Sequence, residues 1–400
     1  MPMQPRTNAA SARSARQLPD RWTTGPRAPR PVRLHPIKEL RLHLENPERF
    51  DLARLGWDEA REGELAPHEG LVPGRVSDQQ RGSYGVLVAA GEIRAEAAGR
   101  LHRDAVGQAD LPAVGDWVVV DLDGGRPTIR AVLERRTALV RKAAGRGSSE
   151  QVLAANVDVV LVVDSLDGGP NRRRLERYLA AAWESGAEPI VVLTKADLTD
   201  DGPATAADVA ASCFVRTYAV SAVTGERVPD VAALFEGDRT AAVVGPSGAG
   251  KSTLANRLLA DERQATAAVR DDGRGRHTTT YRELFLLPEG GVVVDTPGLR
   301  ELGLAGDGSG TGAAFPEVDE LAAGCRFADC AHEREPGCAV QAALADGRLD
   351  PARLASWRKL AREVRFYAER KDARKRAERR KAMRRFERSR RRASEGPWRS

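Results

Sequence analysis

The stretch GPSGAGKST, from Gly245 to Thr253, fits the pattern G-x-x-x-x-G-K-[ST] of a phosphate-binding loop. It follows the apolar run TAAVV and leads into the helical run STLANRLLA, which is the strand, loop and helix context that the pattern requires. Glycines let backbone amides close around phosphates, and the start of the helix adds its positive dipole end. We expect Lys251 to reach the outer phosphates and the Ser252 hydroxyl to bind magnesium. The loop residues expected to bind the nucleotide are Gly245, Ser247, Gly248, Ala249, Gly250, Lys251, Ser252 and Thr253.

Two further elements of a phosphate switch follow along the chain. DTPG ends the apolar run GGVVV, so that Asp295 is placed to hold magnesium through water and the Gly298 amide to meet a terminal phosphate. Between the two lies GRHTTT, whose hydroxyls at Thr278 and Thr279 are candidate magnesium ligands. The sequence leaves open which of the three consecutive threonines binds the metal.

A base-reading element, TKAD, stands before the phosphate loop. The carboxylate of Asp197 can accept two hydrogen bonds from guanine, whereas adenine presents neither donor in that arrangement, so GTP is expected over ATP. The Lys195 stem can lie along the base plane, and Ser221 and Ala222 of VSA can supply a backbone amide to the guanine carbonyl. Thr194 stands where many GTPases have Asn, and its shorter hydroxyl should retain only part of the Asn hydrogen bonding.

The order of these elements determines the fold prediction. Continuous apolar runs such as NVDVVLVVDS and EPIVVLTKADL alternate with helical stretches such as RRRLERYLAAAWESG, which predicts a doubly wound α/β domain with a parallel sheet. The ligand should lie beyond the carboxyl ends of the strands. Base reading first and phosphate binding second describe a circularly permuted P-loop GTPase domain, which we predict over residues 150–305.

Short alternating segments separated by Gly, Asp and Pro precede this domain. They predict a small all-β barrel over residues 68–145. An oligonucleotide-binding (OB) barrel and an SH3-like barrel are both compatible with the pattern. Trp117 and Tyr84 are either platforms for stacked bases or barrel core, and the core is the more frequent place for such aromatics.

Four residues after the nucleotide domain have the spacing of a metal site, C-x4-C-x-H-x5-C. They are Cys325, Cys330, His332 and Cys338. Three thiolates and one imidazole make a closed tetrahedral set for zinc without an open position for water, so the site should be structural. We predict a zinc-binding helical domain over residues 306–370. The remaining cysteine, Cys213, lies in an apolar run and is expected in the core.

Composition sets the frame for these domains. The chain has 400 residues, 41% of them hydrophobic, which allows two or three folded domains. No apolar run reaches the roughly 18 residues of a membrane span, no secretory signal is indicated, and the few cysteines suit a reducing compartment, so we expect the cytoplasm. Residues 1–50, rich in Arg and Pro, predict a disordered extension.

The C-terminal end carries most of the basic charge. From Arg370 to Ser400 there are fifteen Lys and Arg residues against four Asp and Glu residues. We predict a basic helical tail over residues 371–400. It is either a nucleic-acid arm, since each bound phosphate releases counterions, or a solvated helix without a specific partner.

Taken together, the motifs resemble those of the circularly permuted small ribosomal subunit biogenesis GTPases, the RsgA or YjeQ family. The resemblance covers Leu52 to Tyr367 and rests on LPAVGDWV, RKAAG, EQVLAANVD, LTKADL, GPSGAGKSTL, GRHTTT, DTPGLREL and CRFADCAHEREPGCAV. It implies an N-terminal OB-type barrel, a central permuted GTPase and a C-terminal zinc domain, which together engage the maturing small ribosomal subunit and its rRNA. It also implies GTP hydrolysis that the subunit stimulates and that is coupled to late assembly and to release of the protein.

The sequence has no glutamine at the position that orients the attacking water in many GTPases. Many GTPases carry a Gln just after DxxG to orient water, but the residue here is Leu299, which cannot do so. The resemblance offers His277 as the water-positioning group, and we expect it to act together with Lys251. The expected cofactors are GTP or GDP, Mg²⁺ and one structural Zn²⁺, in a monomer without membrane contact. The alternative is an rRNA-binding assembly factor that uses GTP mainly as a binding switch, which Leu299 and the lack of an obvious catalytic carboxylate motivate.

Overall fold

The computed structural model describes residues 50–80, 82–123, 125–142, 150–260, 283–295 and 308–370, together with Met383. Four sequence predictions lie outside these residues. They concern the extension before residue 50, the segment that carries His277, Thr278 and Thr279, the position of Gly298, and all of the basic tail except Met383.

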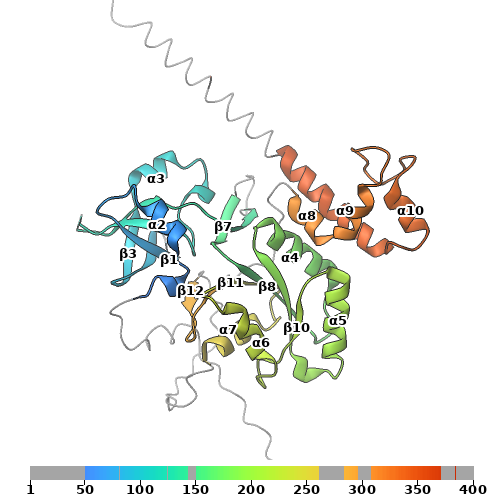
Figure 1. Ribbon diagram of the computed structural model, residues 1–400, viewed down its shortest axis with the longest axis horizontal. Coiled ribbons are helices and arrows are strands. Elements are labelled where there is room, and N and C mark those ends of the chain that lie inside the picture. Colours follow the sequence, from blue (N-terminus) through green and yellow to red (C-terminus); the bar gives the residue numbers. More distant parts are fainter. Residues whose placement is uncertain are drawn as a thin grey trace, which may run out of the picture. The chain divides into compact units, whose positions relative to one another are not determined.

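The nucleotide-binding domain is built on strands whose order in the sheet is β10-β9-β8-β11-β13-β12. Figure 1 labels β10, β8, β11 and β12 of this sheet. Their bounds are β8 Val159–Ser165, β9 Glu188–Thr194, β10 Thr217–Ala219, β11 Thr240–Val244, β12 Glu283–Leu286 and β13 Val292–Asp295. Neighbouring strands are parallel, except for the antiparallel pair β12 and β13. Strands buried on both faces need apolar side chains in both directions, which explains the continuous apolar runs VVLVV in β8 and IVVL in β9.

Helices cover both faces of this sheet. Alternate side chains of β8 enter different core clusters, because successive residues of a strand point to opposite faces. Val160 and Val162 pack in one cluster with α4 (Arg172–Glu184) and α5 (Gly202–Cys213). Leu161 and Val163 pack in the other with α6 (Val228–Ala232) and α7 (Lys251–Ala260). The short 3-10 helices in this domain are η4 Ala196–Leu198 and η5 Ala233–Phe235.

The strand order shows the circular permutation directly. β8 and β9 precede β11 in the chain but lie on one side of it, whereas β13 and β12 follow it and lie on the other side. In such sheets the ligand binds where the strand order switches, beyond the carboxyl ends of the strands. The base-reading loop after β9 and the phosphate loop after β11 therefore face the same edge of the sheet, and the predicted permuted α/β fold is confirmed.

The N-terminal barrel has a closed five-strand order, β1-β2-β3-β5-β4, in which β4 returns to pair with β1. The strands are β1 Val72–Gln80, β2 Ser83–Val88, β3 Gly91–Ala97, β4 Trp117–Asp121 and β5 Thr128–Val132. β3 pairs in parallel with β5, and α3 (Gly99–Asp104) and η3 (Gln108–Asp110) connect β3 to β4. This is an OB-type arrangement, which settles the choice left open by the sequence. Trp117 and Tyr84 are only 2% and 1% exposed, so they are core residues and not stacking platforms.

The remaining elements flank these two domains. η2 (Ala53–Leu55) and α2 (Glu59–Leu65) precede the barrel, and β6 (Ala138–Lys142) pairs with β7 (Glu150–Ala155) in a separate two-stranded sheet. The C-terminal part is helical, as predicted. It contains α8 Ser309–Ala314, α9 Pro316–Ala322, α10 Ala339–Ala345 and a further helix that begins at residue 351 and is described to residue 370.

A buried arginine, Arg75 of β1, joins the barrel to the nucleotide domain. Its guanidinium donates to the carbonyl oxygens of Leu55, of Gly115 at 3.3 Å and of Asn156 at 3.0 Å. Burial lowers the pKa of Arg75 to about 10, so the group still carries its charge at neutral pH. Asn156, just before β8, has a left-handed backbone with φ of 54° and receives a further bond from Arg61 at 2.8 Å.

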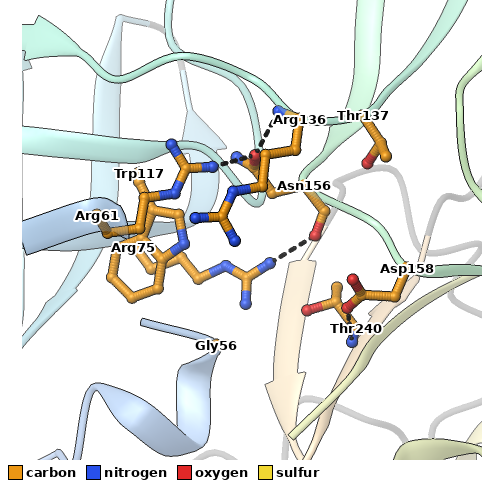
Figure 2. A pocket seen from close by; sticks show the side chains of 9 residues that line it. All are labelled: Gly56, Arg61, Arg75, Trp117, Arg136, Thr137, Asn156, Asp158 and Thr240. Carbon is orange, nitrogen blue, oxygen red and sulfur yellow. Dashed lines mark hydrogen bonds between the residues drawn. The ribbon is translucent and has the colours of Figure 1, made fainter. Parts of the chain in front are cut away.

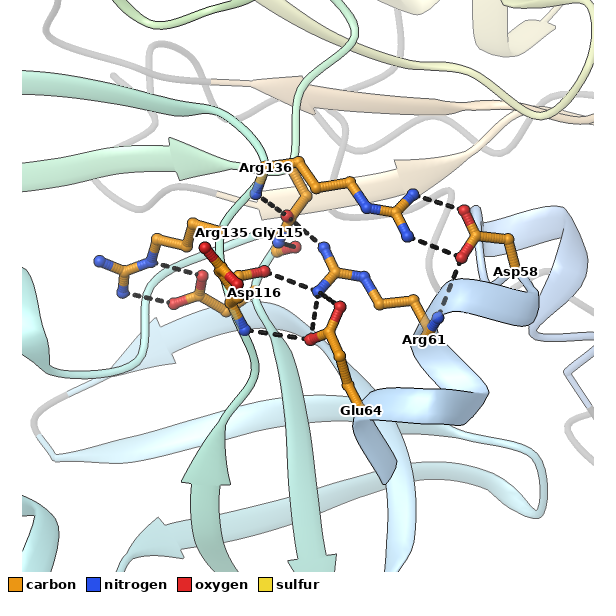
Figure 3. Close-up of polar contacts among 9 residues, drawn as sticks. Asp58, Arg61, Glu64, Gly115, Asp116, Arg135 and Arg136 are labelled. Atoms are coloured by element: carbon orange, nitrogen blue, oxygen red, sulfur yellow. Dashed lines mark hydrogen bonds and ion pairs between the residues drawn. The ribbon is translucent and has the colours of Figure 1, made fainter. Parts of the chain in front are cut away.

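Figure 2 shows this junction, and Figure 3 shows the polar contacts of Arg61 and Arg136. Arg75, Arg61 and Asn156 line one small pocket together with Asp158 and Thr240 of the nucleotide domain (Figure 2). Around it, Arg61 pairs with Glu64 and Arg136 pairs with Asp58 (Figure 3). The bonds from Arg136 lower the pKa of Asp58 to about 2. The junction is thus held by guanidinium groups that reach backbone and side-chain oxygens from three segments of the chain.

Replacing Arg75 with methionine is expected to destabilise this junction. The substitution keeps much of the side-chain volume but leaves the carbonyl oxygens of Leu55 and Asn156 without this donor, at a cost of about 2–4 kcal/mol, whereas the Gly115 carbonyl still accepts from the Asn156 side-chain amide at 3.1 Å. Urea unfolding followed by tryptophan fluorescence measures the loss, and Arg126→Met is the control because the pair of Arg126 with Glu96 is exposed. Equal unfolding midpoints for the two variants would contradict the role given to Arg75.

Candidate nucleotide site and candidate metal centre

The phosphate loop has the backbone that its glycines allow. Gly245, Gly248 and Gly250 have φ of 145°, 81° and 83°, which side chains disfavour. A Cβ at Gly245 would lie 2.1 Å from the carbonyl oxygen of Val163 in β8, so only glycine fits there. Lys251, the first residue of α7, donates from Nζ to the carbonyl oxygens of Gly245 at 2.9 Å and Pro246 at 2.7 Å. Its ammonium group therefore lies over the loop, where bound phosphates are expected.

Thr194 ties the base-reading loop to the phosphate loop. Its hydroxyl lies 2.6 Å from the carbonyl oxygen of Ala249 and 3.3 Å from that of Asp164. A Cβ on Gly250 would come within 3.0 Å of the same hydroxyl. The threonine is short enough to fit against this glycine and long enough to bond to the Ala249 carbonyl oxygen. It therefore connects the base-reading loop to the phosphate loop, although the sequence led us to expect that it would retain only part of the hydrogen bonding of Asn.

The carboxylate expected to read the base is held by a second loop. The Ser221 hydroxyl donates to Asp197 Oδ1 at 2.5 Å, and the amide of Thr224 donates to the same hydroxyl at 3.1 Å. The Val220 amide donates to the carbonyl oxygen of Leu193, which holds the strand ends together. Ser221 is fully buried, whereas Asp197 is exposed. The buried Ser221 hydroxyl therefore orients the Asp197 carboxylate from the protein interior, while the solvent-facing side of the carboxylate stays accessible to a ligand.

Asp295, the candidate for holding magnesium through water, ends β13 and is 6% exposed. It pairs in register with Val243 of β11, two residues before the phosphate loop begins. The structure thus places Asp295 at the end of the strand next to β11, which leads into the phosphate loop. Ser252 lies in the first turn of α7, and the other candidate magnesium ligands lie outside the described residues.

The loop between β8 and α4 was not predicted to belong to the site. The Leu166 amide donates to the carbonyl oxygen of Thr194 at 3.0 Å, and Asp167 Oδ2 lies 3.2 Å from Lys195 Nζ. Both contacts join the TKAD motif to residues about 28 positions earlier in the chain, Leu166 and Asp167, which belong to no motif. The parallel pairing of β8 with β9 was the available signal, because it places Ser165 beside Thr194.

The Cys and His residues with metal-site spacing come together in the C-terminal part. The potential ligand atoms of Cys325, Cys330, His332 and Cys338 all lie within 4.8 Å of one another. Cys325 Sγ is 3.9 Å from Cys338 Sγ, and these two sulfurs lie 3.5 Å and 3.6 Å from His332 Nδ1.

These spacings match the edges of a zinc tetrahedron. Zinc–sulfur bonds of about 2.3 Å and zinc–nitrogen bonds of about 2.0 Å place two sulfurs about 3.8 Å apart and a sulfur about 3.5 Å from a nitrogen. Burial lowers the pKa of His332, which favours the neutral imidazole that a metal ligand must be. The donor set therefore fits zinc in a site closed by four protein ligands.

The surroundings of this cluster link it to the C-terminal helix. The carbonyl oxygen of His332 accepts from the Gln341 amide group and the Arg358 guanidinium, and the His332 ring lies 5.3 Å from the Trp357 ring. On the same helix, Arg353 pairs with Glu176 of α4 at 3.0 Å and with Glu317 of α9 at 2.7 Å. The candidate metal centre is thus connected to α4 of the nucleotide domain through one helix.

A second set of contacts holds α8 against α4. The Glu184 carboxylate accepts from the amides of Gly308 at 3.2 Å and Gly310 at 2.8 Å. A Cβ on Gly310 would lie 2.1 Å from the carbonyl oxygen of Ala180, so glycine allows the two helices to touch backbone to backbone. Arg177 of α4 also pairs with Glu363 at 2.7 Å. None of these connections carries a sequence motif.

Within the described ranges, no helix is both long and apolar enough to cross a membrane.

Solved structures with similar folds support the permuted arrangement. The chain is similar to the crystal structure of YjeQ from Thermotoga maritima, with 23% identity and a TM-score of 0.53, covering 75% of this chain and 98% of that one. It is also similar to the structure of YloQ, described as a circularly permuted GTPase, with 25% identity and a TM-score of 0.52. That similarity covers 76% of this chain and 97% of YloQ.

Relatives with known names are closer in sequence. The small ribosomal subunit biogenesis GTPase RsgA of Opitutus terrae is 48% identical over 341 residues, which cover 80% of this chain and 92% of the relative. The protein of the same name from Streptomyces coelicolor is 48% identical over 333 residues, covering 81% of this chain and 90% of the relative. The sequence profile of the RsgA GTPase matches residues 132–305. The chain therefore belongs to the RsgA family of circularly permuted GTPases.

Proposed function

We propose that this GTPase acts on the maturing small ribosomal subunit, where it couples GTP hydrolysis to a late assembly step and to its own release. The observation that carries the proposal is the joined nucleotide site, in which Thr194 ties the base-reading loop to the phosphate loop and Ser221 orients Asp197. This site belongs to a chain that matches, over nine-tenths of their length, relatives named small ribosomal subunit biogenesis GTPases. Those names favour a hydrolase over an assembly factor that only binds GTP.

In the proposed site each group has a separate task. Asp197 accepts hydrogen bonds from guanine, Lys251 moves from the loop carbonyls to the outer phosphates, and Gly245 to Thr253 surround the phosphates with amides. Bound magnesium neutralises charge on the phosphates. Its proposed ligands are Ser252, Thr278, Thr279 and, through water, Asp295. The Gly298 amide senses the terminal phosphate, and His277 is the proposed group that orients the attacking water.

The zinc site is proposed to have a structural role. Cys325, Cys330, His332 and Cys338 would hold one Zn²⁺ and thereby fix the loop between α9 and α10. With four protein ligands no position is left for a reacting water. The metal would support the surface that this domain presents to the subunit.

For the ribosomal partner we propose rRNA contacts through the barrel, the C-terminal helical domain and the basic tail. The exposed Lys359, Arg362, Arg365 and Arg370 of the C-terminal helix support this, because they continue the positive charge of the following residues. Such contacts should weaken as salt rises, since bound phosphates release counterions. The protein is proposed to act in the cytoplasm, where the subunits mature, and as a monomer.

Co-sedimentation with purified ribosomal subunits tests the proposed partner. The protein should pellet with small subunits in the presence of a non-hydrolysable GTP analogue, and much less with GDP. Large subunits serve as the control for general attraction to rRNA. Equal recovery with both subunits, or no recovery with either, would contradict a specific role at the small subunit.

A further inference from the structure

We propose that Asp167 is a positioning residue for nucleotide binding, which fixes the ammonium group of Lys195 and thereby the wall of the guanine pocket. The proposal rests on the base-reading role of Lys195. It assigns a function to the loop over residues 165–171, between β8 and α4, which no motif indicates.

The first support is the attachment of this loop to the base-reading loop. Parallel pairing places Ser165 beside Thr194, and the Leu166 amide donates to the carbonyl oxygen of Thr194 at 3.0 Å. A Cβ on Gly202, the first residue of α5, would lie 3.3 Å from the Leu166 side chain. The loop is therefore packed against the segment that carries Lys195 and Asp197, on the side of the neighbouring strand.

The second support is that the loop has a fixed shape. The buried carboxylate of Asp164 accepts from the amides of Ser165 at 2.9 Å and Asn171 at 3.2 Å, which are the two ends of the loop. Arg174 Nη2 of α4 donates to both oxygens of the same carboxylate, at 2.8 Å and 3.0 Å. The Asp164 carboxylate thus binds both ends of the loop and the Arg174 guanidinium of α4. These bonds restrict how far the loop can move.

The turn that presents Asp167 is also ordered internally. The Asp167 amide donates to the Ser165 hydroxyl at 3.1 Å, and the Gly169 amide donates to the carbonyl oxygen of Leu166 at 3.0 Å. Gly168 and Gly169 have φ of 79° and 81°, a conformation in which side chains are strained. The two glycines allow the chain to turn back directly after Asp167, so its carboxylate projects from a tight turn.

The third support is the contact itself. Asp167 Oδ2 lies 3.2 Å from Lys195 Nζ, and the backbone of Lys195 is left-handed, with φ of 62°. A lysine side chain loses much rotamer freedom when it must lie along a ligand. Because Asp167 holds the ammonium group at the rim, the aliphatic stem is already directed before guanine enters. The carboxylate thus reduces the entropy that nucleotide binding must overcome.

The test is nucleotide binding and turnover by the full chain with Asp167→Asn. The dissociation constants of fluorescent GDP and GTP analogues and the KM for GTP are expected to rise about two- to fivefold, the range of a partly exposed ion pair. The kcat should change less than about twofold, since the contact is present before and during the reaction. Asp200→Asn, which changes an exposed carboxylate beyond η4, is the matched control and should leave both dissociation constants, the KM and the kcat unchanged.

Two further variants separate the proposal from simpler explanations. Asp167→Glu keeps the charge and should restore binding to within about twofold of the wild type. In a Lys195→Met background, Asp167→Asn should have no further effect, because the partner of the carboxylate is gone. A general loosening of the loop would instead weaken binding equally in both backgrounds and would overturn the proposal.

The remaining outcomes are also decisive. Unchanged or tighter nucleotide binding by Asp167→Asn would overturn the positioning role of Asp167. If Lys195→Met still weakens binding in that case, Lys195 contributes to base reading without help from Asp167. If Lys195→Met has no effect on binding, the role of Lys195 fails and the role of Asp167 fails with it. A GTPase that still prefers GTP to ATP in that case would leave the proposed function itself intact.

Discussion

Replacing Lys251 with alanine is expected to reduce GTP turnover at least about 100-fold, because the variant lacks the cation that offsets charge on the reacting phosphates. The fold should persist, since Lys251 Nζ donates to the carbonyl oxygens of Gly245 and Pro246 in its own loop. The measurement is single-turnover hydrolysis of GTP without ribosomal subunits. This isolates the chemical step from any effect on partner binding.

The control for this experiment is Lys359→Ala, which removes an exposed lysine from the C-terminal helix. It should leave hydrolysis in the absence of subunits unchanged. A Lys251→Ala protein that hydrolyses GTP within about tenfold of the wild type would contradict the electrostatic role of this lysine.

The second large effect is expected from Cys338→Ser. Cys338 is buried, and its sulfur accepts from the Gln341 amide at the start of α10 in addition to facing the other three ligands. Structural zinc contributes roughly 10–16 kcal/mol of apparent binding free energy in small zinc domains, so losing one of four ligands should release the ion and loosen the helical domain. Zinc content by elemental analysis should fall from one ion per chain to near zero, and limited proteolysis should cut between α9 and α10.

Cys213→Ala provides the matched control for this prediction. Cys213 ends α5 in the core of the nucleotide domain and is not part of the cluster, so the variant should keep one zinc ion per chain. A Cys338→Ser protein with full zinc content and an unchanged proteolysis pattern would contradict the structural role of the metal.

The permuted nucleotide domain could be predicted from the sequence because its signals are local. Gly245 to Thr253 forms a motif within a strand, loop and helix context, and β8 and β9 appear as continuous apolar runs. The Cys and His cluster could be predicted for the same reason, since its four candidate ligands lie within fourteen residues. Trp117 and Tyr84 are buried in the core, which is the more frequent location for aromatic residues in a small barrel.

The connections between these parts could not be predicted, because each depends on residues distant in sequence. The parallel pairing of β3 with β5 distinguishes the OB-type barrel from other small barrels. This pairing cannot be inferred from the alternation of apolar and polar residues within each strand. Nothing in the sequence around Arg75 distinguishes it from a solvent-facing strand residue, yet its side chain is buried at the junction, where it donates to the Asn156 carbonyl oxygen. Arg353 meets Glu176 across 177 positions, and Asp167 meets Lys195 only because β8 and β9 are neighbours.

The most direct test of the whole account is GTP hydrolysis by the purified protein, alone and with purified small or large ribosomal subunits. We expect slow turnover alone, strong stimulation by small subunits and none by large subunits, with ATP as a poor substrate throughout. The absence of stimulation by small subunits, or equal stimulation by both, would contradict a GTPase whose hydrolysis is coupled to the small subunit.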